Sequence, residues 1–138
     1  MSNSNKPLLS KKLSSTRREI PKVEAFVDEL NQTLQLEEPQ YNTLMLALSE
    51  AVTNAVVHGN KEDATKTVTL QAWKEKGDLH ISVKDQGDGF DPGLLPNPLN
   101  DQNLLKEGGR GVFLMKQYAD NVEYRDGGST VVLTFNLE

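Results

Sequence analysis

The chain has 138 residues, with 15 basic and 20 acidic side chains and a formal net charge of −5. This length fits one domain with its own core, and 36% hydrophobic against 25% charged residues is typical of a globular protein. The acidic balance disfavours a nucleic-acid-binding surface, and the lack of cysteine excludes disulfides and thiolate metal sites. No apolar run approaches the roughly 18 residues of a membrane span, and the N-terminus lacks the apolar core of a signal peptide. We therefore expect a cytoplasmic protein.

The N-terminal half predicts a strand followed by two helices. Residues 1–7 are rich in Ser and Asn and are expected to be flexible, whereas residues 8–138 are expected to form a single domain. A strand is expected at residues 8–13. Apolar residues at helical spacing predict a first helix, which starts either at Pro21 or at the capping box of Thr16 and Glu19. A second helix is expected from Pro39 to about His58, where Gly59-Asn60 ends it.

The C-terminal half predicts two hairpins separated by a long loop. Residues 66–74 and 79–83 alternate between apolar and polar side chains, which predicts an antiparallel hairpin. Residues 86–108 read as a loop, residues 111–118 as a short helix, and residues 122–124 and 131–137 as a closing hairpin. This order predicts an α+β two-layer sandwich, with helices on one face of a mostly antiparallel, mixed sheet.

Glu50 and Asn54 form the first candidate pair of site residues. They lie one turn apart on the second predicted helix and therefore share a face. An Asn carbonyl oxygen is a hard ligand suited to Mg²⁺, and a Glu carboxylate can take a proton from an attacking hydroxyl. An ordinary polar helix face accounts for the same pattern.

Asp85 is the second candidate. It continues the alternation of Leu79, Ile81 and Val83, so it is expected to point inward, where a carboxylate needs a partner. An adenine amino group is one such partner, because a carboxylate only accepts hydrogen bonds. Gly87 and Gly89 would allow the backbone to approach a flat base. A simple turn after a strand is the alternative interpretation.

A third candidate is the glycine-rich segment 108–111, which precedes the short predicted helix. Exposed N–H groups at a helix N-terminus favour phosphate, and Lys106 and Arg110 could add positive charge. A flexible loop leading into a helix accounts for this pattern equally simply. Ser129 opens the last predicted strand, where its hydroxyl could reach Asp85 and the base through water. Turn chemistry explains Ser129 just as well.

Three motifs in this order resemble the GHKL (Bergerat-fold) ATP-binding superfamily, and within it the bacterial anti-sigma-factor serine/threonine kinases. The motifs are LSEAVTNAVVHG at residues 48–59, VKDQGDGFD at residues 83–91 and GGRGVFLM at residues 108–115. The resemblance runs from about Leu9 to the C-terminus. It implies the Bergerat type of two-layer fold and binding of ATP or ADP with Mg²⁺.

The resemblance also implies a role for each matching residue. Glu50 resembles the general base and Asn54 the Mg²⁺ ligand, and Asp85 resembles the carboxylate that reads adenine. Residues 92–108 resemble a short ATP lid. The residues implied in nucleotide binding are Asn54, Asp85, Gly87, Gly89, Lys106, Gly109, Arg110, Gly111 and Ser129, the last of which stands where the superfamily often has Thr.

The resemblance implies a kinase that phosphorylates an anti-anti-sigma protein on Ser or Thr and controls a sigma factor by partner switching. Such proteins commonly form homodimers and are not expected to bind nucleic acid or membranes directly. A module that binds ATP and a partner without phosphoryl transfer is the alternative interpretation. An ATP hydrolase in which Glu50 activates water is a third.

Overall fold

The computed structural model describes residues 7–87 and 115–137. Two helices, α1 and α2, precede four of the five strands. The main elements in chain order are β1 (Leu9–Ser14), α1 (Lys22–Leu34), α2 (Glu38–Asn54), β2 (Thr67–Glu75), β3 (Asp78–Lys84), β4 (Asn121–Arg125) and β5 (Thr130–Asn136). Short helical turns add Arg17–Glu19, Ala55–Gly59 and Asp126–Gly128.

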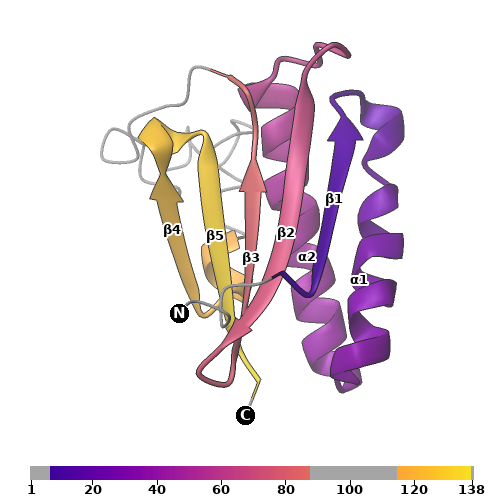
Figure 1. Cartoon of the computed structure of the whole chain (residues 1–138), viewed down its shortest axis with the longest axis vertical. Helices are drawn as coiled ribbons and strands as arrows, with labels where there is room; N and C mark the ends of the chain where they lie inside the picture. The colour runs from indigo at the N-terminus through magenta and orange to yellow at the C-terminus, as the bar shows by residue number, and fades with distance from the viewer. Residues whose placement is uncertain (1–6, 88–114, 138) are drawn as a thin grey trace.

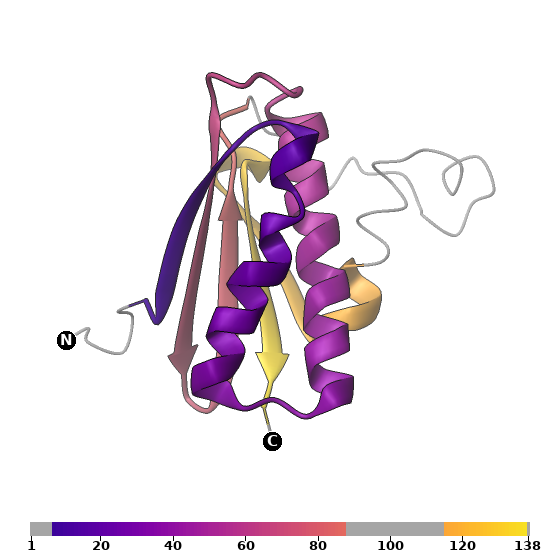
Figure 2. The same ribbon diagram turned by 90° about the vertical axis from the view of Figure 1, so that its right-hand side faces the viewer.

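The strands form one sheet in the order β1-β2-β3-β5-β4 (Figure 1). Each of the four strand pairs is antiparallel. Both helices lie along the same side of this sheet, as the perpendicular view in Figure 2 shows. The structure therefore confirms the α+β two-layer sandwich that the sequence predicts. All the strand pairs it describes are of the antiparallel kind.

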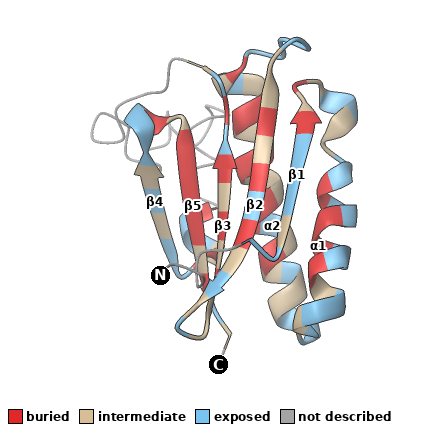
Figure 3. Ribbon diagram, in the orientation of Figure 1, coloured by how far each residue is buried: buried red, intermediate tan, exposed pale blue. Residues whose placement is uncertain are grey.

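The core lies between the helices and the inner face of the sheet. Alternate residues of β2 and β3 are almost fully buried, because successive side chains of a strand point to opposite faces (Figure 3). Phe26 and Leu30 of α1 and Leu48 of α2 fill the other side of the core. Within the residues that the structure describes, no helix is long and apolar enough to cross a membrane.

The beginnings of both helices refine the sequence expectations. The first helix starts at Lys22, directly after Pro21, and Thr16 instead precedes a short 3-10 turn without a side-chain cap. The capping box that the structure does contain is at the second helix, where Glu37 and Gln40 bond each other's backbone N–H groups. This box starts α2 at Glu38, one residue before the expected position, because it satisfies N–H groups that lack partners in the first turn.

The end of the second helix differs in kind from the expectation. The α-helical hydrogen bonding stops at Asn54, and Ala55–Gly59 form a single π-helical turn. The main-chain N–H of Asn60 closes this turn by donating to the carbonyl of Ala55 at 2.8 Å. A π-turn places one more residue between the bonded N–H and C=O groups than an α-turn does. The residues after it therefore lie on a different face of the helix. The helix therefore reaches the expected stop by a wider turn.

Candidate functional site

The candidate site lies where the C-terminal end of α2 meets the end of β3. Glu50 and Asn54 occupy the last turn of α2, and both side chains are half-buried. The intervening residues Ala51 and Val52 point into the core and are almost fully buried. Packing of these two apolar side chains fixes the rotation of the helix, so Glu50 and Asn54 are held at the margin of the core.

Asp85 follows the last residue of β3 and is buried, with 9% of its surface exposed. It continues the inward phase of Ile81 and Val83, as the sequence predicts. Its main-chain N–H donates to the Ser129 carbonyl at 2.8 Å, so the backbone stays in register with the turn before β5. A buried carboxylate at this position is costly without partners.

The two carboxylate oxygens of Asp85 have different surroundings. The Oδ1 atom accepts a hydrogen bond from the Gly87 main-chain N–H at 2.8 Å. Among the described residues, Oδ2 accepts no hydrogen bond, and it lies directly over Gly59. Burial raises the pKa of this carboxyl, while the Gly87 N–H and the charge on Lys66 act in the opposite direction. Within residues 7–87 and 115–137, the protein thus bonds one of the two oxygens and not the other.

Gly59 and Gly87 allow the two backbones to approach each other closely. A Cβ atom on Gly59 would collide with the Asp85 carboxylate, and one on Gly87 would collide with the carbonyl oxygen of Gly59. Each position therefore requires glycine for lack of space. The sequence identifies Gly87 as a base-pocket residue but interprets Gly59 only as a helix stop, because a contact across so many residues leaves no local signal.

Ser129 contacts the site through its main chain. Its carbonyl accepts from the Asp85 N–H, while its hydroxyl donates to the Asp126 carbonyl at 3.0 Å. The hydroxyl thus takes part in the turn, which is the simpler of the two interpretations of the sequence. The remaining nucleotide-site predictions lie outside the described residues, namely Gly89, Lys106, Gly109, Arg110, Gly111 and the expected lid at residues 92–108.

This geometry can be compared with known proteins. The model of the histidine kinase-like ATPase domain family matches residues 13–135, which include α1, α2 and all the strands except the first part of β1 and the last residue of β5. The chain belongs to this family. The resemblance seen in the sequence is therefore confirmed.

Curated proteins similar to this family member include serine-protein kinases and anti-sigma factors. The chain is 42% identical to the serine-protein kinase RsbW of Bacillus licheniformis over 98 residues, which cover 66% of this chain and 61% of that protein. It is 32% identical to the anti-sigma F factor of Geobacillus kaustophilus over 102 residues, covering 72% and 67% respectively. The chain thus spans less than two thirds of the length of the first of these relatives.

A solved structure supports the fold independently. The RsbU and RsbW domains of a Mycobacterium tuberculosis protein align with 94% of this chain and 31% of their own, at a TM-score of 0.66. Sequence identity in that alignment is 20%, so the likeness concerns the fold. It shows that the two-layer arrangement of this family member is shared.

The side chains at the site determine which groups could coordinate a metal ion. Among the described residues, no three His, Cys, Asp or Glu side chains gather closely enough to form a metal site. Mg²⁺ commonly binds through one or two protein oxygens and takes its other ligands from phosphates and water. Asn54, whose amide oxygen is a hard donor at the edge of the core, fits that mode.

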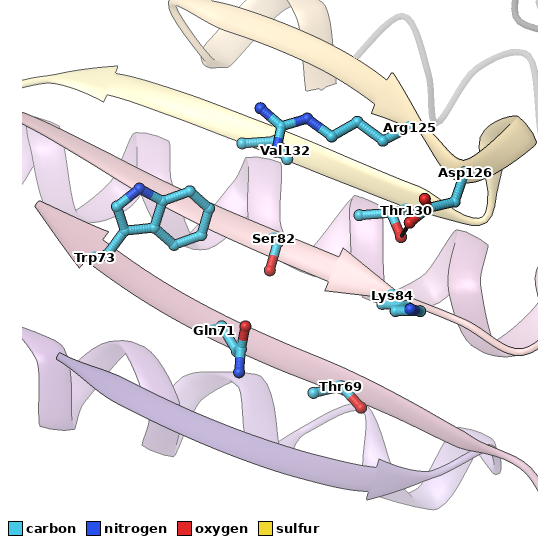
Figure 4. A pocket seen from close by; sticks show the side chains of 9 residues that line it. All are labelled: Thr69, Gln71, Trp73, Ser82, Lys84, Arg125, Asp126, Thr130 and Val132. Carbon is cyan, nitrogen blue, oxygen red and sulfur yellow. Dashed lines mark hydrogen bonds between the residues drawn. The ribbon is translucent and has the colours of Figure 1, made fainter. Parts of the chain in front are cut away.

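A shallow hollow on the other face of the sheet is separate from this site (Figure 4). It has a volume of about 520 Å³ and faces away from both helices. Its lining comes from outward-pointing strand residues and the turn before β5, namely Thr69, Gln71, Trp73, Ser82, Lys84, Arg125, Asp126, Thr130 and Val132. Neither the α2 pair nor Asp85 lines it, so the candidate site is the inner junction.

Proposed function

We propose that this chain binds Mg-ATP at the junction of α2 and β3 and transfers the γ-phosphoryl group to a serine or threonine of a protein partner. The observation that carries the proposal is the buried Asp85 carboxylate, with one oxygen held by Gly87 and the other turned towards Gly59. Membership of the histidine kinase-like ATPase family and kinase relatives at up to 42% identity support it.

Adenine recognition follows from the chemistry of Asp85. The adenine amino group is a donor, and Oδ2 is an acceptor on a residue that is 9% exposed; a hydrogen bond to a charged group is strong. A guanine would present a carbonyl oxygen at the same place and would repel the carboxylate. Gly59 and Gly87 let the end of α2 and the segment after β3 meet closely beside this oxygen, which fixes where a base would meet it.

Phosphoryl transfer is assigned to the residues of α2. The Glu50 carboxylate would take the proton of the partner's hydroxyl as that oxygen bonds to the γ-phosphorus, while the bond to the bridging oxygen breaks and ADP leaves with the electron pair. Asn54 would hold the Mg²⁺. A bound Mg²⁺ supplies neutralisation of the phosphate charge. Both side chains are half-buried, so they lie between the core and the solvent side from which a partner comes.

The biological setting that we propose is partner switching in the cytoplasm. The partner that receives the phosphate is an anti-anti-sigma protein, and the chain binds a sigma factor when that protein is phosphorylated. A homodimer is the proposed assembly. The support is the similarity to relatives named as a serine-protein kinase and an anti-sigma F factor.

The Asp85→Asn variant is expected to lose ATP affinity without losing stability. The amide oxygen would keep the Gly87 hydrogen bond, so the NH₂ group would replace Oδ2 and face the adenine amino group, donor against donor. A buried unmatched polar group costs about 1–3 kcal/mol, which is roughly a 5- to 150-fold weaker dissociation constant. Isothermal titration with Mg-ATP measures this change, and unaltered affinity would contradict the assignment of Asp85.

The difference in stability between the wild type and Asp85→Asn should depend on pH. Since burial raises the pKa of Asp85, the ionised carboxylate costs stability above its folded-state pKa, and that cost disappears as the pH falls below the ordinary carboxyl range. Asp85→Asn should therefore melt at or above the wild-type temperature at pH 7, with a smaller difference at acidic pH. Thermal unfolding monitored by circular dichroism checks this, and a variant less stable at pH 7 would disagree.

Transfer itself is tested with radiolabelled ATP. Proteins that co-purify with the native chain would be identified by mass spectrometry, and the chain would be incubated with each of them, Mg²⁺ and γ-labelled ATP. The proposal expects label on a serine or threonine of one partner. Binding of ATP with no label on any partner would instead favour a nucleotide-gated binding module, and rapid phosphate release without a partner would favour a hydrolase.

A further inference from the structure

The Asn60 side chain makes hydrogen bonds to three other segments of the chain. It is buried, with 1% of its surface exposed, and it follows the π-turn that ends α2. Its amide nitrogen donates to the Ser15 hydroxyl at 2.6 Å and to the Thr67 carbonyl at 3.0 Å. Its amide oxygen accepts from the Gln86 main-chain N–H at 2.7 Å. One side chain therefore joins the end of α2 to β2 and to the residues that follow β1 and β3.

The segment 85–87 depends on this contact. Three successive main-chain N–H groups of the segment have three different acceptors: the Ser129 carbonyl for Asp85, the Asn60 side chain for Gln86 and the Asp85 carboxylate for Gly87. The middle contact is the one that ties the segment directly to the end of α2. The Gln86 side chain points back to the sheet, where its Oε1 accepts from the Thr67 N–H at 2.6 Å.

The position of the Asp85 carboxylate therefore rests on Asn60. Asp85 and Gly87 flank Gln86, so a shift of the Gln86 peptide would move both the base-reading carboxylate and the glycine that approaches Gly59. The segment lies beyond the β3 ladder, which ends at Lys84, so the Asp85 N–H bond to Ser129 is its one main-chain bond to β5 or the turn before it among the described residues. Without the amide oxygen, the Gln86 N–H would lose the hydrogen bond that joins the segment to the end of α2, and the segment would be held less firmly against the helix.

We propose that Asn60 is a positioning residue for nucleotide binding, which sets the Asp85 carboxylate against the end of α2 without touching the nucleotide. The inference rests on the proposed function in that segment 85–87 is taken to bind adenine. It goes beyond that function because Asn60 lies behind the site, and because its contacts couple the helix carrying Glu50 and Asn54 to the strand carrying Asp85.

The test is titration of the purified full chain with a fluorescent ATP analogue and with the matching GTP analogue in Mg²⁺. Asn60→Ala is expected to weaken ATP binding about tenfold, in line with loss of a buried hydrogen bond, and to narrow the preference for ATP over GTP. A change in base preference is a readout that a loss of overall stability does not move. If Asn60→Ala does not fold, Asn60→Ser replaces it, because a serine hydroxyl is too short to reach the Gln86 N–H.

Val27→Ala is the matched control. Val27 is a fully buried residue of α1, so its truncation lowers the melting temperature without contact to segment 85–87. Folded Val27→Ala should keep the wild-type affinity and the wild-type ratio of ATP to GTP. A folded Asn60 variant with both quantities unchanged would overturn this inference alone. Absence of ATP binding by the wild-type chain would overturn the proposed function and, with it, this inference.

Discussion

Replacing Glu50 with glutamine is expected to lower the rate of phosphoryl transfer about 100- to 10,000-fold, which is the usual contribution of a general base. The amide has the size and nearly the shape of the carboxylate but cannot take the proton of the attacking hydroxyl. Glu50 is half-buried near the end of α2, whereas the adenine-reading role is assigned to Asp85 beyond β3. ATP affinity should therefore stay close to that of the wild type, so the loss should appear in kcat rather than in KM.

Single-turnover transfer of labelled phosphate to the partner, with ATP affinity measured in parallel, checks this expectation. Glu29→Gln is the matched control, because Glu29 is an exposed carboxylate on α1 and lies away from the junction. That variant should transfer phosphate at the wild-type rate. Transfer by Glu50→Gln at a rate within a few-fold of the wild type would show that another group accepts the proton.

The Gly87→Ala variant is expected to lose both stability and nucleotide binding. A Cβ atom here would overlap the carbonyl oxygen of Gly59, which belongs to the backbone and cannot rotate away. The end of β3 and the end of α2 would have to separate, and overpacking of this kind costs about 1–3 kcal/mol. Separation would also move the Asp85 carboxylate, and a displacement of about 1 Å of a residue in a functional site can lower activity about 100-fold.

Gly127→Ala is a control of the same chemical kind. Gly127 has a φ of 69° in the turn between β4 and β5, and a Cβ there would meet no atom within 4 Å. Alanine at this position strains the backbone and lowers the melting temperature, but it leaves the junction of α2 and β3 intact. Thermal unfolding and Mg-ATP titration of both variants separate the two effects. Wild-type affinity in Gly87→Ala would mean that the close approach of the two backbones is not needed for binding.

The sequence predicts those parts of the site that depend on periodicity. The inward position of Asp85 follows from the alternation along β3, and burial of Asp85 confirms it. The shared position of Glu50 and Asn54 follows from helical spacing, and both lie half-buried at the end of α2. These signals are local, because each depends on a periodic pattern within a few residues of the side chain concerned.

The parts that the sequence does not predict depend on contacts between distant segments. Gly59-Asn60 reads as a helix stop, yet Gly59 makes room for Asp85, and Asn60 holds the Gln86 N–H at 2.7 Å. The π-turn that delivers both residues has no sequence signature of its own, because it arises where the helix meets the sheet. An Asn near a helix C-terminus is common as a cap, so its type alone could not indicate three hydrogen bonds to distant segments.

The central claim is that a buried carboxylate at the junction of α2 and β3 reads adenine. Its most direct test is equilibrium titration of the wild-type chain with Mg-ATP and with Mg-GTP under the same conditions. We expect saturable binding of one ATP per chain and GTP binding weaker by about tenfold or more, since a carbonyl oxygen would replace the amino donor opposite Asp85. Equal affinities for the two nucleotides, or no binding of ATP, would contradict the claim.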